Sequence, residues 1–156
     1  MSANTMDYSA KPLLLDVIRA ERAKFYDLID EPRNWNVQTR CEAWETRDIV
    51  GHMIDVTEGY LDRWQMAREG RPIDTRGLLV MAEGLDDNAK TFRRFPRDQV
   101  IARLKSDSDK MMAIFDSLTA DDWNTFLVTH PYHVCRFESR GDHRILSRRA
   151  WYAARV

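Results

Sequence analysis

Apolar residues recur every three or four positions along most of the chain between residues 11 and 118, which is the spacing of one face of an α-helix. Four segments follow this pattern: residues 11–30, 46–69, 76–94 and 96–118. No part of residues 11–123 shows the alternation of apolar and polar residues that is typical of a β-strand. The connections are short, so the sequence predicts an all-α fold, an antiparallel four-helix bundle.

The apolar positions also predict which side of each helix faces the core. The predicted core residues are Leu14, Val17, Ile18, Phe25 and Leu28, widened by Leu15 and Ile29, in the first segment; Ile49, Met53, Val56, Tyr60 and Trp64 in the second; Leu78, Met81, Leu85, Ala89 and Phe92 in the third; and Val100, Leu104, Met111, Phe115 and Leu118 in the fourth.

Local residues predict the helix ends and the connections. Thr46 is the predicted N-cap of the second helix, with Asp48 favourably placed in its first turn. Residues 32–45 lack helical periodicity and predict a structured connection, whereas residues 119–122 predict a short capped turn. The charged residues Lys105, Asp107, Asp109 and Lys110 predict a solvated face of the fourth helix.

Composition narrows the range of partners. The chain has 156 residues, enough for one domain with a real core, and its formal net charge of −1 argues against nucleic-acid binding. No apolar run approaches the roughly 18 residues that cross a bilayer, and no signal peptide is visible. Two distant cysteines, Cys41 and Cys135, fit a reducing compartment. We therefore expect a cytoplasmic protein without membrane or nucleic-acid partners.

The last 24 residues differ in kind from the rest. We divide the chain into a helical bundle at residues 1–132 and an atypical tail at residues 133–156, which contains six arginines and no lysine. One hypothesis is a basic, partly ordered extension or short helix. The other is that the tail results from a shifted reading frame in GC-rich DNA, which tends to encode arginine-rich sequence without lysine. The last helix of the bundle would then be missing or altered.

His52 is the candidate metal ligand. It flanks the apolar stripe of the second helix, with Asp48 four residues before it and Asp55 three residues after it on the same strip. A histidine with one or two carboxylates on an inward face can bind a divalent cation together with donors from another helix. The alternative is a neutral core histidine that is hydrogen-bonded to Asp55, with Asp48 serving only the helix N-terminus.

Other reactive side chains offer weaker patterns. His130 and His133 are three residues apart, but Pro131 between them favours a loop in which the pair only packs. His143 lies in the atypical tail. Cys41 precedes the second helix, where its thiol could be reactive or simply buried. No nucleotide-binding, acyl-hydrolase or zincin motif is present, so catalytic and cofactor-binding residues are not assigned.

A longer motif surrounds His52. The stretch from Trp35 to Trp64 contains the run Thr39, Cys41, Trp44, Arg47, Asp48, Ile49, Val50 and His52. This run resembles the N-terminal motif of the mycothiol-dependent maleylpyruvate isomerase family, which belongs to the DinB-like superfamily of thiol transferases and metal-binding proteins. The resemblance covers most of residues 11–132.

The resemblance implies a four-helix bundle that binds a divalent metal, zinc or nickel, through three ligands. The histidine at position 52 would be the first. The other two would come from the last helix, as a carboxylate or histidine four residues before a second histidine. The metal would activate a low-molecular-weight thiol such as mycothiol for transfer to, or isomerisation of, a small electrophile. A homodimer is one assembly that such a protein could form.

The chain departs from this pattern in its tail, where Ser139 stands four residues before His143. A bundle that lacks the last-helix ligands would bind metal weakly and could be inactive. The sequence thus leaves three functions open: a metal-dependent thiol transferase or isomerase, a non-enzymatic helical bundle for interaction or stress response, and a regulator that joins other subunits through the exposed face of the bundle.

Sequencing the coding DNA tests the reading-frame hypothesis. If the tail results from a shifted reading frame, an alternative frame beyond codon 133 should encode an amphipathic helix. If neither alternative frame encodes one, the tail is native to the protein and the hypothesis is wrong.

Overall fold

All the named elements of the protein are helical. The computed structural model describes residues 7–71 and 78–125, which contain the helices α1 (Lys11–Asp30), α2 (Thr46–Arg68), α3 (Leu78–Thr91), α4 (Arg97–Ser117) and α5 (Ala120–Thr125). Short 3-10 turns are η1 (Tyr8–Ala10), η2 (Pro32–Asn34) and η3 (Phe92–Arg94). The prediction of an all-α helical bundle is confirmed. No helix within the described residues is long and apolar enough to cross a bilayer.

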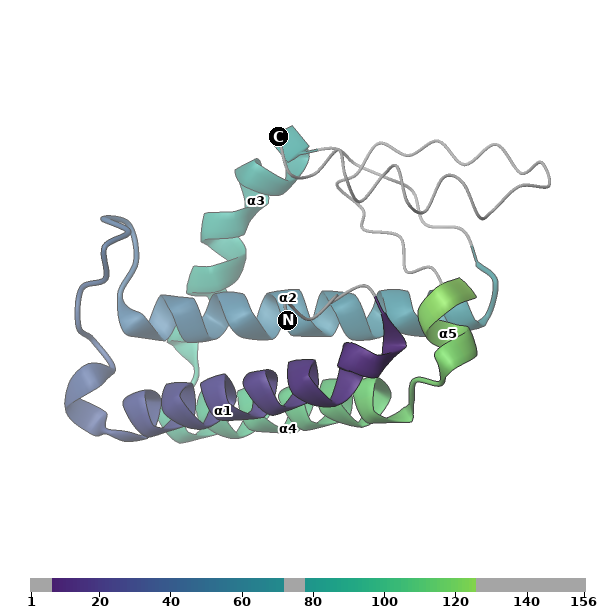
Figure 1. The fold of residues 1–156 in the computed structure, drawn as a ribbon. Coiled ribbons are helices and arrows are strands. Elements are labelled where there is room, and N and C mark those ends of the chain that lie inside the picture. Colours follow the sequence, from purple (N-terminus) through teal and green to yellow (C-terminus); the bar gives the residue numbers. More distant parts are fainter. Residues whose placement is uncertain (1–6, 72–77, 126–156) are drawn as a thin grey trace.

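Three long helices lie lengthwise together, and a fourth, α3, meets α2 at an angle (Figure 1). The helix α4 packs against both α1 and α2, and α1 runs in the opposite direction to the other two (Figure 1). The helix α3 stands across the N-terminal half of α2 and leads through η3 into α4 (Figure 1). Because α3 contacts α2 closely, the first turns of α2 are enclosed on that side.

Proline, glycine and capping residues mark most helix ends. Pro12 lies in the first turn of α1, and Pro96 directly precedes α4. Gly70 follows α2 with a φ of 65°, the left-handed conformation that favours glycine. Thr119 caps α5, since its hydroxyl accepts the backbone N–H of Asp122 at 3.1 Å.

The prediction that Thr46 caps α2 is wrong. Glu45 is the N-cap, and its backbone N–H donates to the Asp48 carboxylate at 2.8 Å. The Thr46 hydroxyl instead donates to the carbonyl oxygen of Val37 at 3.3 Å. The preceding connection folds back along the start of α2, so this hydroxyl faces the connection and leaves the cap position to Glu45. The prediction that residues 32–45 form a structured connection is confirmed by η2 and by an isolated bridge between Gln38 and Glu45.

The core lies where α4 meets α1 and α2. Its most buried members come from all three helices: Ile29, Val50, Ile54, Val100, Ile101 and Leu104. Phe25, Tyr26, Trp35 and Phe92 pack against this cluster.

The predicted core-facing stripes of α1 and α2 are partly wrong. Val17, Leu28 and Met53 are 52%, 49% and 41% exposed, whereas Leu15, Ile29, Val50 and Ile54 are buried. Both helices carry apolar residues on two adjoining strips, and only the strip that meets α4 or α3 becomes buried. On α4 itself, the predicted Val100, Leu104 and Leu118 are buried.

The prediction of a wholly solvated charged face on α4 also fails at one position. Asp107 is only 5% exposed, and one of its oxygens accepts from the Lys110 ammonium at 2.7 Å. The carboxylate lies on the side of α4 that faces α2, and Lys110 one turn later reaches back to it.

Gly51 permits the close crossing of α2 and α3. A Cβ atom added there would lie 2.2 Å from the carbonyl oxygen of Ala89 and 3.0 Å from a ring carbon of Phe92. Ala89 is itself 1% exposed, so backbone and small side chain meet directly. A larger residue would push α3 away from the start of α2.

Gly51→Ala should therefore destabilise the protein by about 1–3 kcal/mol, the usual cost of overpacking a core. Chemical denaturation monitored by circular dichroism measures the change. Gly59→Ala is the matched control, because its Cβ would meet only the Arg63 guanidinium, at 3.7 Å or more. That substitution should stabilise the same helix by about 0.5–1 kcal/mol. Equal effects at both glycines would contradict the close crossing.

Candidate functional site

His52 lies in the second turn of α2, beside the crossing with α3. Its side chain is half-buried, and its ring packs against Trp44 with 5.1 Å between ring centroids and 46° between ring planes. The Nδ1 atom has no accessible surface and no hydrogen-bond partner among residues 7–71 and 78–125. A buried imidazole nitrogen without a hydrogen-bond partner is costly.

Asp48 does not join His52 as a ligand. Its side chain is fully buried, and both of its oxygens accept hydrogen bonds from Arg93, at 2.7 Å from Nε and 2.6 Å from a terminal nitrogen. One oxygen also accepts the Glu45 backbone N–H. Asp48 therefore serves the helix N-terminus, as one of the two sequence interpretations holds, and it also fastens η3 to α2.

The same contacts set the charge state of this pair. Burial raises the pKa of Asp48, but the hydrogen bonds from Arg93 and from the Glu45 N–H outweigh it and hold the pKa below its usual value. The hydrogen bonds to Asp48 in turn raise the pKa of Arg93. Both groups are therefore ionised near neutral pH, and the carboxylate is occupied.

Asp55 also points to another partner. One of its oxygens accepts the side-chain amide of Asn88 at 3.3 Å. In the part of the chain that the structure describes, no group of three or more His, Cys, Asp or Glu side chains is arranged to hold a metal ion. The described residues therefore offer His52 as a donor without completing a metal centre around it.

Trp44 links His52 to α3. The indole N–H donates to one oxygen of Asp86 at 2.7 Å, and the Lys90 ammonium donates to the other at 2.8 Å. The hydrogen bonds from Lys90 and then Trp44 lower the pKa of Asp86. Neither Asp86 nor Arg93 was identified from the sequence. Their spacing of seven residues indicates that they share one helical face. It does not identify their partners, Trp44 and Asp48, which lie more than forty residues away in the sequence.

The remaining sequence candidates are separate from this cluster or outside the described residues. Cys41 is a free, exposed cysteine in the turn before α2. Its backbone N–H donates to the Thr39 hydroxyl at 3.1 Å, so it contributes to the shape of that turn. His130, His133 and His143, with the whole predicted tail, lie outside the described residues.

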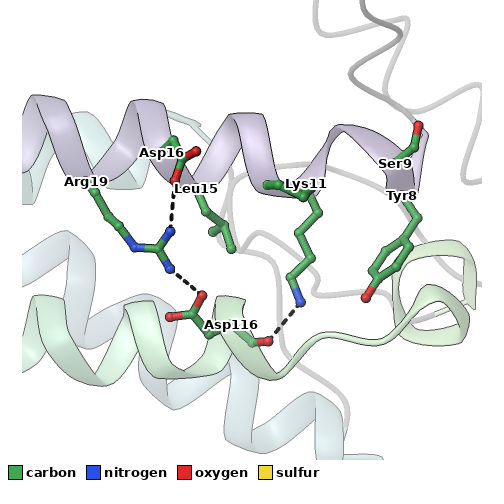
Figure 2. A pocket seen from close by; sticks show the side chains of 8 residues that line it. Tyr8, Ser9, Lys11, Leu15, Asp16, Arg19 and Asp116 are labelled. Atoms are coloured by element: carbon green, nitrogen blue, oxygen red, sulfur yellow. Dashed lines mark hydrogen bonds and ion pairs between the residues drawn. The ribbon is translucent and has the colours of Figure 1, made fainter.

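A hollow of about 410 Å³ lies between the start of α1 and the end of α4 (Figure 2). Its polar groups already have partners: the Lys11 ammonium donates to the carbonyl oxygens of Asp116 and Leu118 at 2.8 and 2.6 Å, and Arg19 joins Asp16 to Asp116. A cation at carbonyls that end a helix is a favourable helix-end contact. These contacts thus hold the start of α1 against the end of α4.

A second hollow of about 530 Å³ lies between α2 and α4. Two of its carboxylates form ion pairs within the chain, Asp107 with Lys110 and Glu58 with Arg103. Neither hollow is lined by His52. The chemistry that the family motif implies must therefore be sought at the start of α2.

Asp48→Asn should lower the free energy of unfolding by about 1–3 kcal/mol at neutral pH, because Arg93 loses its charged partner. We expect the difference from the unsubstituted protein to be constant between pH 5 and 7. The folded-state pKa of Asp48 is lowered, so its stabilising effect is present above the unfolded value of about 3.9 and is lost as pH falls through the folded value. Denaturant unfolding at several pH values measures this.

Asp55→Asn is the matched control on the same helix. Its carboxylate is only partly buried and has one long contact with Asn88, so the free energy of unfolding should change by less than about 0.5 kcal/mol. A difference for Asp48→Asn that persists undiminished at pH 3 would contradict the ionised pair.

Comparison with known families gives a match over most of the chain. Residues 18–134 match the family described as the mycothiol maleylpyruvate isomerase N-terminal domain. Comparison with curated proteins and with solved structures gives no match. The match spans most of the chain and includes the whole of α2, α3 and α4. The chain therefore belongs to the mycothiol maleylpyruvate isomerase N-terminal domain family.

Proposed function

We propose that this chain is a divalent-metal-binding protein of the mycothiol-dependent isomerase or transferase type, in which His52 is a metal ligand. The observation that carries the proposal is the half-buried His52 ring, whose Nδ1 atom is enclosed and without a hydrogen-bond partner in the described part of the chain. Family membership supports it, because the match includes His52 and the motif around it. A cytoplasmic location belongs to the same proposal.

The described residues fit a metal only in part. His52 is one donor, Asp48 is bound to Arg93, and a stable zinc site needs at least three protein donors. The proposal therefore requires further donors from residues outside the described ranges. Zinc is the expected metal, with nickel as the alternative, since imidazole suits both. A bound metal would lower the pKa of a thiol such as mycothiol and present the thiolate to a small electrophile.

A non-enzymatic role is the second candidate. It is favoured by the fact that no group of three metal-binding side chains occurs within residues 7–71 and 78–125. In that case the helical bundle would serve as an interaction or stress-associated module, and His52 would be a remnant. Metal content separates the two candidates more directly than any activity assay.

The full chain, purified without added chelator, should carry zinc or nickel that is measurable by inductively coupled plasma mass spectrometry. His52→Ala should reduce this content to background, because it removes the one imidazole available on α2. Asp55→Asn is the control: its carboxylate already contacts Asn88, and its metal content should match that of the unsubstituted protein. Circular dichroism checks that all three proteins are folded.

Metal near zero in both the unsubstituted protein and His52→Ala would overturn the proposal and favour the non-enzymatic role. Where metal is present, transfer of a low-molecular-weight thiol to a generic small electrophile distinguishes an enzyme from a protein that only binds metal.

A further inference from the structure

The orientation of the His52 ring depends on a side chain that lies outside α2. Trp44 precedes the helix by two residues and is 8% exposed. Its ring lies against the imidazole with 5.1 Å between centroids. A buried indole needs a partner for its N–H group, and Asp86 on α3 provides one at 2.7 Å. The indole is thus fixed at its polar end and meets His52 with its ring.

We propose that Trp44 is the positioning residue of His52, and that Asp86 fixes Trp44 in the orientation this requires. The three side chains contact one another in succession. The Asp86 carboxylate accepts the indole N–H of Trp44, and the indole ring limits the rotation of the imidazole. The nitrogens of His52 are therefore held in one direction. The consequence for metal binding rests on the proposed function. The positioning of the His52 ring by Trp44 and Asp86 does not rest on it.

The surrounding packing explains why this contact is firm. Asp86, Ala89 and Arg93 share one face of α3 and η3, at spacings of three and four residues. Ala89 meets Gly51, and Arg93 holds Asp48, so α3 and η3 are fixed to α2 at two points in the turns just before His52. Asp86 therefore has a defined position relative to α2 when it accepts the indole N–H.

Orientation matters for a ligand histidine because the group that packs against or bonds to its ring selects the direction of the donor nitrogen. In metal proteins, loss of an outer partner that hydrogen-bonds to a ligand typically costs about 10–100-fold in metal affinity, and we expect loss of the ring packing to have a comparable effect. Here the Nδ1 atom has no hydrogen-bond partner in the described residues, so ring packing is the restraint that the structure offers.

The test uses the full chain with substitutions at Trp44 and Asp86. The resonances of the His52 ring are assigned by comparison with His52→Gln and followed by heteronuclear NMR, and zinc affinity is measured by titration. Trp44→Leu should shift the His52 ring resonances, because the ring current of the indole is lost, and should weaken zinc binding about 10–100-fold. Asp86→Ala should shift the same resonances while the core stays intact, since Asp86 is half exposed.

Two variants separate positioning from a general structural effect. Asp86→Asn retains an oxygen that accepts the indole N–H and should restore the His52 resonances close to those of the unsubstituted protein. Lys90→Met removes the other partner of the same carboxylate and leaves the indole bond, so it should leave these resonances unchanged.

Unchanged His52 resonances in Asp86→Ala and in folded Trp44→Leu would overturn the proposal, as would Lys90→Met shifting them as much as Asp86→Ala. If Trp44→Leu fails to fold, Asp86→Ala and Asp86→Asn decide the result. If the unsubstituted protein binds no zinc, the proposed function fails while the resonances still decide whether Trp44 positions His52.

Discussion

A fully buried carboxylate at the start of α2, that of Asp48, determines how α3 and η3 pack against α2. A charge in the interior is tolerated only when it is paired and hydrogen-bonded, and Asp48 obtains that pairing from Arg93, which lies beyond the end of α3. The pairing brings η3 against α2. It thereby places Ala89 on Gly51 and Asp86 within reach of Trp44. The ion pair and the contacts around His52 therefore share the same pairing of α2 with α3 and η3.

The same pairing limits the chemistry of the site. From the sequence alone, Asp48 stood in line with His52 as a second metal donor. In the folded protein its oxygens accept hydrogen bonds from a guanidinium and from a backbone N–H, so its charge is paired and it adds no ligand beside His52. Metal binding must then depend on donors other than Asp48 that reach His52. The measured metal content is therefore the test of the proposed function.

Sequence patterns predicted the helices better than their packing. The bounds of α1, α2 and α4 follow from proline, glycine and apolar periodicity, which act locally. The buried strip of each helix depends on where its neighbour lies, so Val50 and Ile54 are buried while Met53, between them, stays exposed. The partners of Asp48 and Trp44 depend on tertiary contacts across more than forty residues, which no local pattern encodes.

Most residues of the family motif have a task in the fold that does not involve metal. Thr39 shapes the turn through its hydrogen bonds to Cys41 and Trp44, and Asp48 anchors η3. Val50 fills the core. A chain can therefore keep this motif because the scaffold needs it, whether or not the remaining metal donors survive. Family membership accordingly reports the architecture around His52, and the imidazole nitrogen without a hydrogen-bond partner in the described residues is the structural observation that supports the proposed ligand.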